Sequence, residues 1–143
     1  MKIINIFFLA PLFFCLVSCG EESNIKELPN GKFIDITMVG TWAGSEEGNQ
    51  EADLSKYWNV ERNDDGTFKM EFILDQQGER KQTTESGTWW IKEDKYYELK
   101  RGALHPDIYT YEFLSDKKIK FKASSLSINF VNEDYEFIDN KVD

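Results

Sequence analysis

The chain has 143 residues, of which 26 are Asp or Glu and 17 are Lys or Arg, for a net charge of −9. This length suits one domain, an aromatic content of 15% excludes a disordered chain, and an acidic surface argues against nucleic acid as a partner. One histidine and two cysteines exclude a site built on several histidines and a zinc cluster made of cysteines alone, so no metal or cofactor is expected.

Residues 1–18 are typical of a signal peptide. Lys2 precedes an apolar run from Ile3 to Val17, which is too short for a settled membrane span and is interrupted by Pro11. A polar, charged stretch follows at once. We therefore predict that residues 1–18 are removed, with a buried core helix or a retained anchor as the alternative.

The end of the apolar run carries a modification motif. Its last residues read Leu16-Val17-Ser18-Cys19-Gly20 and resemble the lipobox of bacterial lipoproteins. The resemblance implies that Cys19 becomes the lipidated first residue of the mature chain, whose acyl chains, palmitate among them, insert into a lipid bilayer. We therefore expect an outer-membrane lipoprotein of the bacterial cell envelope.

A polar segment, residues 19–35, follows. It contains an Asn30-Gly31 turn signal and shows no sustained period, so we predict a flexible tether between the lipid and the folded part. Glu21-Glu22 resemble the acidic export signals that send some Bacteroidota lipoproteins to the cell surface. Surface display and an ordinary solvated linker both remain open.

Residues 36–143 are predicted to form one β domain, because apolar side chains recur there with period two. In Lys118–Ala123 every second residue is lysine and the others are apolar, which gives a strand one wet face and one buried face. The same test predicts further short strands near residues 38–43, 58–62, 67–74, 88–91, 96–99, 109–113, 126–130 and 135–137. About eight short strands with short links predict an all-β fold, an antiparallel up-and-down meander that closes into a small barrel, with a sandwich as the other option.

The connectors support this interpretation. Residues 63–66 read Asn-Asp-Asp-Gly and predict a tight hairpin, because Asp-Gly supplies the positive φ angles that such turns need. A calcium loop is the alternative, but its twelfth position would be Phe72, where a bidentate glutamate is required. Further turns are predicted at residues 76–78, 92–94 and 115–117.

Six short motifs are spread over most of residues 38–137. They read Gly40-Thr41-Trp42, Tyr57-Trp58, Asp65-Gly66-Thr67-Phe68, Gly87-Thr88-Trp89-Trp90, Lys95-Tyr96-Tyr97-Glu98 and Tyr111-Glu112-Phe113-Leu114-Ser115. Together they resemble the lipocalin-like domains found in many Bacteroidota lipoproteins. The resemblance implies a small barrel with the first tryptophan packed at its closed end and no catalytic residues. Lipocalins often cover that tryptophan with an arginine of the last strand, and this chain has no arginine there.

The aromatic residues are the candidate binding residues. The inward faces of the predicted strands give an interior lined by Trp58, Phe68, Met70, Tyr109, Tyr111 and Phe121. An eight-stranded barrel is just wide enough to be filled by side chains or to hold one small ligand. We hypothesise a membrane-anchored, non-catalytic module that binds a small apolar or amphipathic ligand. The alternative is a protein-interaction or envelope-structural module with a filled barrel.

The polar residues that could take part in catalysis do not indicate an enzyme. The acidic loop Glu46–Asp53 has Gly, Asn and Gln neighbours, so its carboxylates are expected to be solvated. His105 lies in a loop with Gly and Pro and is expected to be exposed. Trp89 and Trp90 are adjacent and must face opposite ways in a strand, and the outward one would suggest a contact surface. A buried carboxylate pair lining a cleft is the observation that would favour an enzyme.

Overall fold

The computed structural model describes residues 24–48, 51–127 and 134–142. It consists of short strands and a single 3₁₀ turn, and none of its helical structure has the length and apolarity needed to cross a membrane. The elements are β1 (Ile25–Glu27), β2 (Phe33–Asp35), η1 (Ile36–Met38), β3 (Gly40–Glu47), β4 (Leu54–Arg62), β5 (Thr67–Gln76), β6 (Glu79–Lys92), β7 (Lys95–Lys100), β8 (Asp107–Ser115), β9 (Lys118–Ser125) and β10 (Glu136–Lys141). The expected signal peptide and Cys19 lie outside the described residues.

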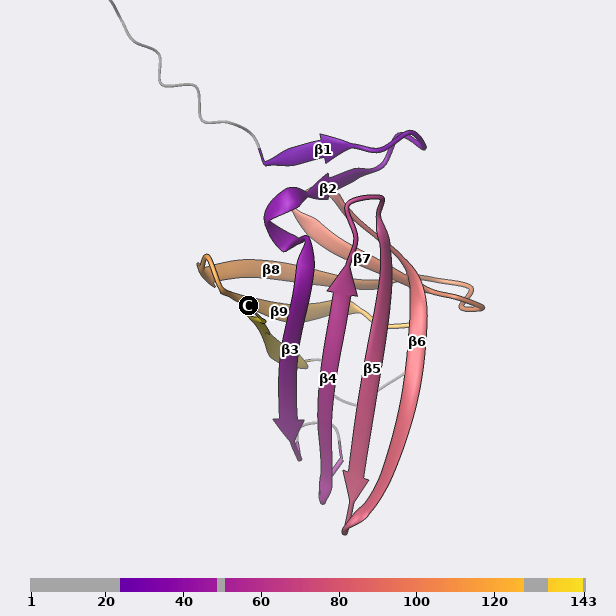
Figure 1. Ribbon diagram of the computed structural model, residues 1–143, viewed down its shortest axis with the longest axis vertical. Coiled ribbons are helices and arrows are strands. Elements are labelled where there is room, and N and C mark those ends of the chain that lie inside the picture. The colour runs from indigo at the N-terminus through magenta and orange to yellow at the C-terminus, as the bar shows by residue number, and fades with distance from the viewer. Residues whose placement is uncertain (1–23, 49–50, 128–133, 143) are drawn as a thin grey trace, which may run out of the picture.

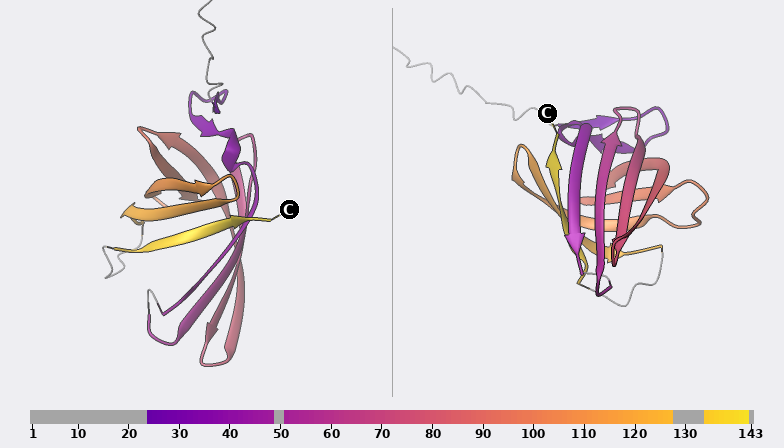
Figure 2. Two further views of the ribbon diagram at one scale, coloured as in Figure 1. Left: turned by 90° about the vertical axis from the view of Figure 1, so that its left-hand side faces the viewer. Right: turned by 60° about the horizontal axis from the view of Figure 1, so that its bottom comes forward.

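Strands β3 to β10 form a closed antiparallel barrel (Figure 1). Each strand pairs with the next in the sequence, and β10 returns to pair with β3. The predicted all-β barrel of about eight strands is therefore confirmed. In Figure 1, β8 and β9 cross almost at right angles to β3, β4 and β5, and Figure 2 shows the lower ends of β3, β4 and β5 extending beyond the crosswise strands.

One long strand, β6, joins the two sides of the barrel. Its first part pairs with β5 and its last part, from Gly87 onward, pairs with β7. A Cβ atom at Gly87 would overlap the carbonyl oxygen of Leu99 and crowd the Phe68 ring. Glycine at this point lets β6 pass from one side of the barrel to the other while both neighbours stay close.

The N-terminal segment differs from its prediction. Residues 24–35 were expected to be the end of a flexible tether, but β1 and β2 form an antiparallel hairpin, and Phe33 of β2 pairs with Ile91 of β6. The Asn30-Gly31 signal closes this hairpin, and the two apolar side chains Leu28 and Ile34 are buried in the core. The tether prediction is therefore wrong for the described part, because this hairpin has its own apolar residues to bury.

The first tryptophan packs at the end of the barrel next to η1. Trp42 is fully buried, and its indole nitrogen donates a hydrogen bond of 2.8 Å to the carbonyl oxygen of Met38. Lys141 of β10 brings its Nζ to 5.3 Å from the centroid of the Trp42 ring. A cation from the last strand thus covers this tryptophan, although the chain has no arginine there.

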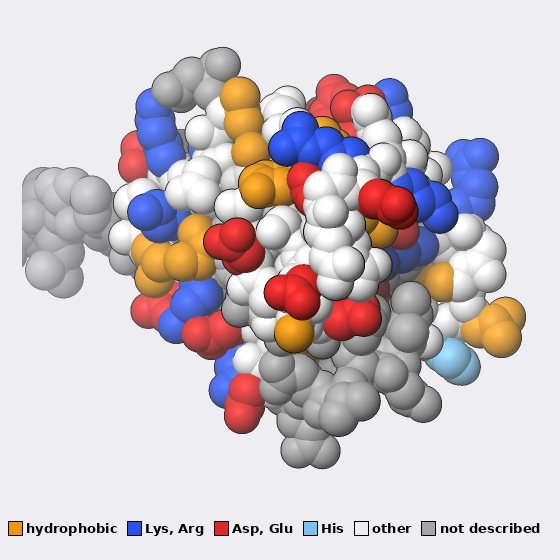
Figure 3. All heavy atoms as spheres, turned by 90° about the horizontal axis from the view of Figure 1, so that it is seen from below, with side chains coloured by type: hydrophobic (Ala, Val, Ile, Leu, Met, Phe, Trp, Pro, Cys, Tyr) orange, Lys and Arg blue, Asp and Glu red, His pale blue; other side chains and the backbone are white. Residues whose placement is uncertain are grey.

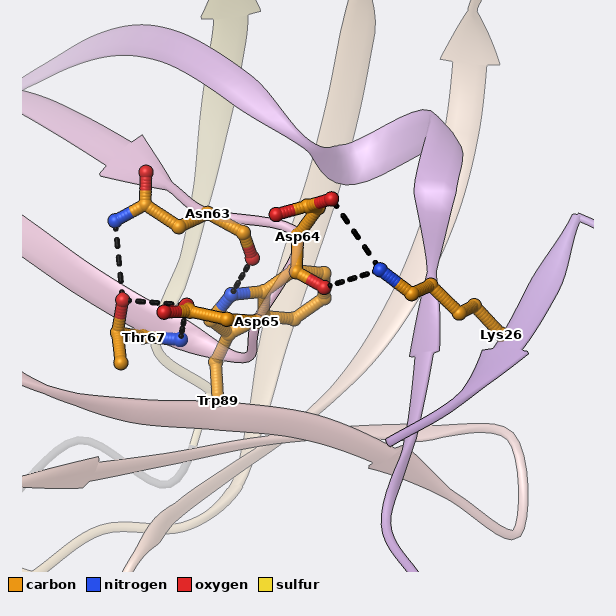
Figure 4. Close-up of polar contacts among 6 residues, drawn as sticks. All are labelled: Lys26, Asn63, Asp64, Asp65, Thr67 and Trp89. Atoms are coloured by element: carbon orange, nitrogen blue, oxygen red, sulfur yellow. Dashed lines mark hydrogen bonds and ion pairs between the residues drawn. The ribbon is translucent and has the colours of Figure 1, made fainter. Parts of the chain in front are cut away.

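The β4–β5 hairpin helps to close the same end of the barrel (Figure 4). Asp65 accepts hydrogen bonds from the backbone and the hydroxyl of Thr67, and Gly66 has a φ of +80°. The carbonyl of Asn63 accepts from the indole nitrogen of the buried Trp89 at 3.2 Å. The predicted hairpin is confirmed, and its side chains are used in turn geometry rather than in an ion site.

The other strand predictions are mostly confirmed, with boundaries shifted by a few residues. The turns at 76–78, 92–94 and 115–117 also lie where they were expected. One strand prediction is wrong in its described part, because Leu126 and Ser127 lie outside any strand. The rest of that predicted strand falls on residues 128–133, which lie outside the described part of the chain.

Candidate binding cavity

A cavity of about 460 Å³ occupies the interior of the barrel. Strand β4 runs along it, and the side chains that face it are the alternate residues Leu54, Lys56, Trp58, Val60 and Arg62. This spacing follows from the period of two in a strand. Because Arg62 lies at the closed end and Leu54 at the opposite end, β4 sets the long direction of the cavity.

The neighbouring strand supplies an apolar wall. Met70, Phe72 and Leu74 of β5 line the cavity beside β4. Across the interior lie two aromatic rings, Tyr109 of β8 and Phe137 of β10, whose centroids are 5.4 Å apart in an edge-to-face arrangement. One side of the cavity can therefore take up apolar surface from a ligand.

The floor of the cavity is polar. Nη2 of Arg62 lies 2.7 Å from Oδ2 of Asp139, and the Trp58 indole nitrogen donates to Oδ1 of the same carboxylate at 2.8 Å. The Nε of Arg62 donates to the hydroxyl of Tyr96 at 3.1 Å. Although burial alone would lower it, the neighbouring Tyr96 and Asp139 raise the pKa of Arg62 above its ordinary value, so the guanidinium remains charged.

Gly44 makes this floor possible. It is the register partner of Trp58 across β3 and β4, and a Cβ atom at Gly44 would overlap the six-membered ring of the indole. The missing side chain leaves room for Trp58 to lie against β3 with its nitrogen directed at Asp139.

One nitrogen of the Arg62 guanidinium makes no hydrogen bond to the described residues. Nε and Nη2 are held by Tyr96 and Asp139, but Nη1 is buried and has no hydrogen-bond partner among the described residues. The Cζ atom of Arg62 lies 5.1 Å from the centroid of the Tyr96 ring and 5.3 Å from that of Phe121, so the guanidinium packs against two aromatic rings and Nη1 is enclosed by the core below the cavity.

A second polar group lies on the adjoining wall. Glu98 of β7 and Asp107 of β8 are register partners, and both are buried and line the cavity. Lys100 bridges from this pair to Glu85, with its Nζ 3.4 Å from Asp107 and 3.3 Å from Glu85. Three carboxylates therefore face a single ammonium group.

Burial raises the pKa of Glu98 to about 6, although the positive charges of Arg62 and Lys100 oppose the shift. The hydroxyl of Tyr96 donates to Glu98 at 2.9 Å. Burial also raises the pKa of Tyr96 well above its ordinary value, so this hydroxyl keeps its proton and remains a donor. Glu98 therefore takes up a proton at a higher pH than an exposed glutamate does.

The family model for a lipocalin-like domain matches residues 38–121, more than half of the chain. The chain belongs to the lipocalin-like domain family. No curated protein matches it. Lipocalin-like barrels suggest a ligand-binding module and generally bind without catalysis, which agrees with a cavity inside this lipocalin-like barrel. The match ends at Phe121, so β10, which supplies Asp139, lies beyond the matched region.

The six residues that the sequence assigned to the interior divide into two groups. Trp58, Met70 and Tyr109 line the cavity of the lipocalin-like barrel. Phe68 and Phe121 are buried in the packed core, and Tyr111 is half-buried against it. A period of two tells which face a residue occupies, but not how far along the strand the packed part gives way to open space.

The polar residues of the cavity were missed. Their sequence signal is the strand phase: Arg62 continues the inward series of Trp58, and Asp139 continues that of Phe137. Glu98 and Asp107 stand two residues from the inward tyrosines of β7 and β8. A charged residue two positions along a strand from an inward-facing aromatic residue also faces inward, so each of these residues was a candidate for a buried charge.

The expectation for the acidic loop is wrong at Glu46. Its side chain is only 2% exposed and lies 3.0 Å from Nζ of Lys56. Glu46 is not in the loop at all, because β3 continues through Glu47, and the inward-facing residues of this strand are Trp42, Gly44 and Glu46.

Burial, together with the charge of Glu46, raises the pKa of Tyr135 above its ordinary value.

Two surface expectations are confirmed. His105 is exposed in the loop between β7 and β8. Trp89 faces the core and Trp90 faces outward, where Nζ of Lys32 lies 3.5 Å from the ring centroid and Tyr97 stacks at 5.3 Å. Among the residues that the structure describes, no group of three His, Cys, Asp or Glu side chains could hold a metal ion.

Proposed function

We propose that this lipocalin-like barrel is a non-catalytic module that holds one small apolar or amphipathic ligand, and that acylated Cys19 anchors it in the bacterial outer membrane. The observation that carries the binding role is the cavity of about 460 Å³ between the apolar wall of β5 and the aromatic rings of β8 and β10. Ligand pockets for small molecules occupy roughly 300–1,000 Å³ and are mostly apolar with a few polar groups.

The cavity favours ligand binding over a filled barrel that serves only as a structural or interaction module. Packed protein interiors contain few voids larger than a water molecule. The outward Trp90, which could have served as a contact surface, is already covered by Lys32 and Tyr97.

The Glu98–Asp107 pair is the arrangement that would favour an enzyme. Both carboxylates already have partners, however, since Asp107 accepts from the backbone N–H of Ser127 at 2.6 Å and pairs with Lys100, and Glu98 accepts from Tyr96. We therefore propose that these carboxylates make one wall of the cavity polar and that they do not transfer protons.

Native mass spectrometry of the protein purified from its own host tests the binding role. We expect a retained small molecule whose occupancy falls in Leu74→Trp, because the larger side chain enters the cavity. Ile73→Trp is the matched control, since Ile73 is the adjacent residue of β5 and faces outward. A protein that carries no ligand in any form, or equal occupancy in the two variants, would contradict the proposal.

The anchoring proposal rests on the lipobox-like motif. Cys19→Ala is expected to leave the membrane fraction of the host, whereas Cys15→Ala, which changes the other cysteine, is expected to stay in it. Protease added to whole cells then distinguishes surface display from the periplasmic side, because only a surface-exposed barrel is accessible to it. Membrane fractionation of Cys19→Ala like the unchanged protein would rule out this anchor.

A further inference from the structure

We infer that the ligand of this cavity carries a positively charged amine, and that Glu98 binds this group on the wall formed by β7 and β8. The inference rests on the proposed binding function and specifies the chemical class of the ligand as an amphipathic amine. It excludes a carboxylate and an uncharged alcohol as the preferred polar end.

The side chains that line the cavity carry more negative than positive charge. Among the described residues, five carboxylates and three cationic groups line it: Glu51, Glu85, Glu98, Asp107 and Asp139, and Lys56, Arg62 and Lys100. Residues 49–50 and 128–133, which lie outside the described part, contain no lysine or arginine. A ligand with one positive charge would reduce this excess of negative charge, whereas an anion would add to it.

The two cations of β4 are matched by acids of β3 and β10. Nη2 of Arg62 lies 2.7 Å from Oδ2 of Asp139, and Nζ of Lys56 lies 3.0 Å from Oε1 of Glu46, whose side chain is 2% exposed. An anionic ligand would have to share one of these cations with the carboxylate that it already holds. Buried charges are costly unless they are paired, so these two cations favour an anion only weakly.

The wall of β7 and β8 holds an acid that is not fully compensated. Nζ of Lys100 is shared between Glu85 and Asp107, at 3.3 Å and 3.4 Å. Burial raises the pKa of Glu98 to about 6, although Arg62 and Lys100 lie beside it and oppose the shift. The ionised Glu98 therefore still carries a desolvation cost, which a bound ammonium group would reduce.

One oxygen of Glu98 is open to the cavity. Oε2 accepts a hydrogen bond of 2.9 Å from the hydroxyl of Tyr96. Oε1 accepts no hydrogen bond from the described residues and, unlike Nη1 of Arg62, is not fully enclosed by protein atoms. Because Glu98 is only 5% exposed and lines the cavity, this oxygen faces the interior of the barrel. An ammonium N–H can donate to it without displacing Tyr96.

An aromatic ring beside Glu98 also suits a cation. Tyr109 lines the cavity two residues along β8 from Asp107, the register partner of Glu98. Burial, followed by the charges of Glu98 and Asp107, raises the pKa of Tyr109 well above its ordinary value, so its hydroxyl stays neutral beside these acids. The centroid of the Phe137 ring lies 5.4 Å from that of Tyr109. Aromatic rings attract ammonium groups through their quadrupole, and more strongly where water is excluded.

The approach to the cavity is acidic as well. Glu51 lines the cavity and is exposed just before β4, so the cavity reaches the surface at the end of the barrel where β4 begins. Figure 3 views the molecule from this end, and acidic side chains lie near the centre of that face. Negative potential along the approach raises the local concentration of cations and lowers that of anions.

The apolar body of the ligand has a place along β5. Met70 of β5 is the register partner of Glu85, so the apolar wall begins next to the acidic one. Phe72 and Leu74 continue this wall away from the floor of the cavity. A molecule with its amine at Glu98 would lay its chain along these side chains and bury apolar surface over its length.

Three probes with the same ten-carbon chain test the inference on the unmodified protein: decylamine, 1-decanol and decanoate, titrated by calorimetry at pH 7.5. At this pH the amine is charged and Glu98 is ionised. We expect decylamine to bind at least about tenfold more tightly than either of the other two. A smaller preference, or tighter binding of 1-decanol or decanoate, overturns the inference while leaving the binding function in place.

Glu98→Gln distinguishes a contact at Glu98 from a general attraction of cations to an acidic protein. Glutamine keeps an oxygen for Tyr96 but has no charge, so the affinity for decylamine is expected to fall about tenfold while that for 1-decanol stays the same. Glu61→Gln, the same substitution on the exposed face of β4, is the matched control and should bind decylamine like the unmodified protein. Equal affinity of the two variants for decylamine would show that Glu98 does not hold the amine. Should Glu98→Gln fail to fold, the order of the three probes on the unmodified protein decides.

If none of the three probes binds, the molecule retained by the host-purified protein decides. A retained amine supports the inference. A retained neutral or anionic molecule overturns it and leaves the binding function in place, whereas the absence of any retained molecule overturns both.

Discussion

Arg62 and Asp139 form a fully buried ion pair inside the barrel, with Nη2 and Oδ2 2.7 Å apart and side-chain exposures of 2% and 0%. Arg62 ends β4, and Asp139 belongs to β10, the strand that closes the barrel. Since β10 pairs with β3 through only two residue pairs, Asn140 with Ala43 and Lys141 with Trp42, the ladder at this seam is short. The ion pair and the Trp58–Asp139 hydrogen bond hold the closing strand from inside the barrel.

Asp139→Asn is expected to destabilise the protein by about 3–5 kcal/mol, because it leaves the buried guanidinium without a counter-charge. Urea denaturation monitored by circular dichroism measures the change. Asp75→Asn removes an aspartate that pairs with the exposed Arg80 and should have a much smaller effect, because solvent screens this pair. A similar, small effect of both substitutions would show that the buried pair is not what holds β10.

Gly44→Ala is expected to cost about 1–3 kcal/mol, because the new methyl group overlaps the Trp58 ring and the two strands cannot separate without breaking their pairing. It should also change the tryptophan fluorescence spectrum, since the indole must move away from Asp139. Ser45→Ala, at the exposed neighbouring position of β3, is expected to stay within about 0.5 kcal/mol of the unmodified protein. If Gly44→Ala changes neither the stability nor the fluorescence spectrum, Trp58 can adopt another position in the barrel.

The barrel could be predicted because its strands alternate strongly and its turns carry Gly and Asp at fixed places. β9 shows both features, with lysines on one face and Ile119 and Phe121 buried on the other. The first half of β6 was not found, because residues 79–86 are polar on both faces. Its inward side chains Thr83 and Glu85 face the cavity, where apolar residues are not required.

The polar floor of the cavity could be predicted only in part. The phase of each strand indicates that Arg62 and Asp139 point inward, but their contact joins residues 77 positions apart and depends on which strands meet when the barrel closes. The unsatisfied Nη1 depends on the geometry of one guanidinium group. Such a detail follows from packing in three dimensions and leaves no pattern in the sequence.

Leu28→Ala tests whether the N-terminal hairpin belongs to the fold. Leu28 is buried and packs beside Gly66 at the closed end, so the substitution is expected to cost about 2–5 kcal/mol in thermal or urea unfolding. Glu27→Ala, at the adjacent exposed position, should change the unfolding free energy by less than about 0.5 kcal/mol. If residues 24–35 were only a tether, the two substitutions would be equally harmless.

Glu98 is expected to make the stability of the protein fall as the pH rises from 4.5 to 6. Burial raises the pKa of this carboxyl from 4.5 to about 6 in the folded protein, so the folded state binds the proton more tightly than the unfolded state. Below this window Glu98 is protonated in both states and carries no penalty. Above it the carboxylate is ionised in both, and the native state is less stable by about 2 kcal/mol on account of this group.

Glu98→Gln removes this titration while its amide oxygen can still accept from Tyr96. The free energy of unfolding of the variant, relative to the unmodified protein, should therefore rise by about 1.5 kcal/mol between pH 4.5 and 6.5, measured by urea denaturation at each pH. The cations Arg62 and Lys100 face this position in both proteins and stay charged throughout this pH range, so the comparison isolates the carboxyl of Glu98. Glu61→Gln, on the exposed face of β4, should shift the unfolding free energy by less than about 0.5 kcal/mol throughout. A flat difference for Glu98→Gln would show that Glu98 is ionised in the folded barrel with no desolvation penalty, and would place it in contact with water.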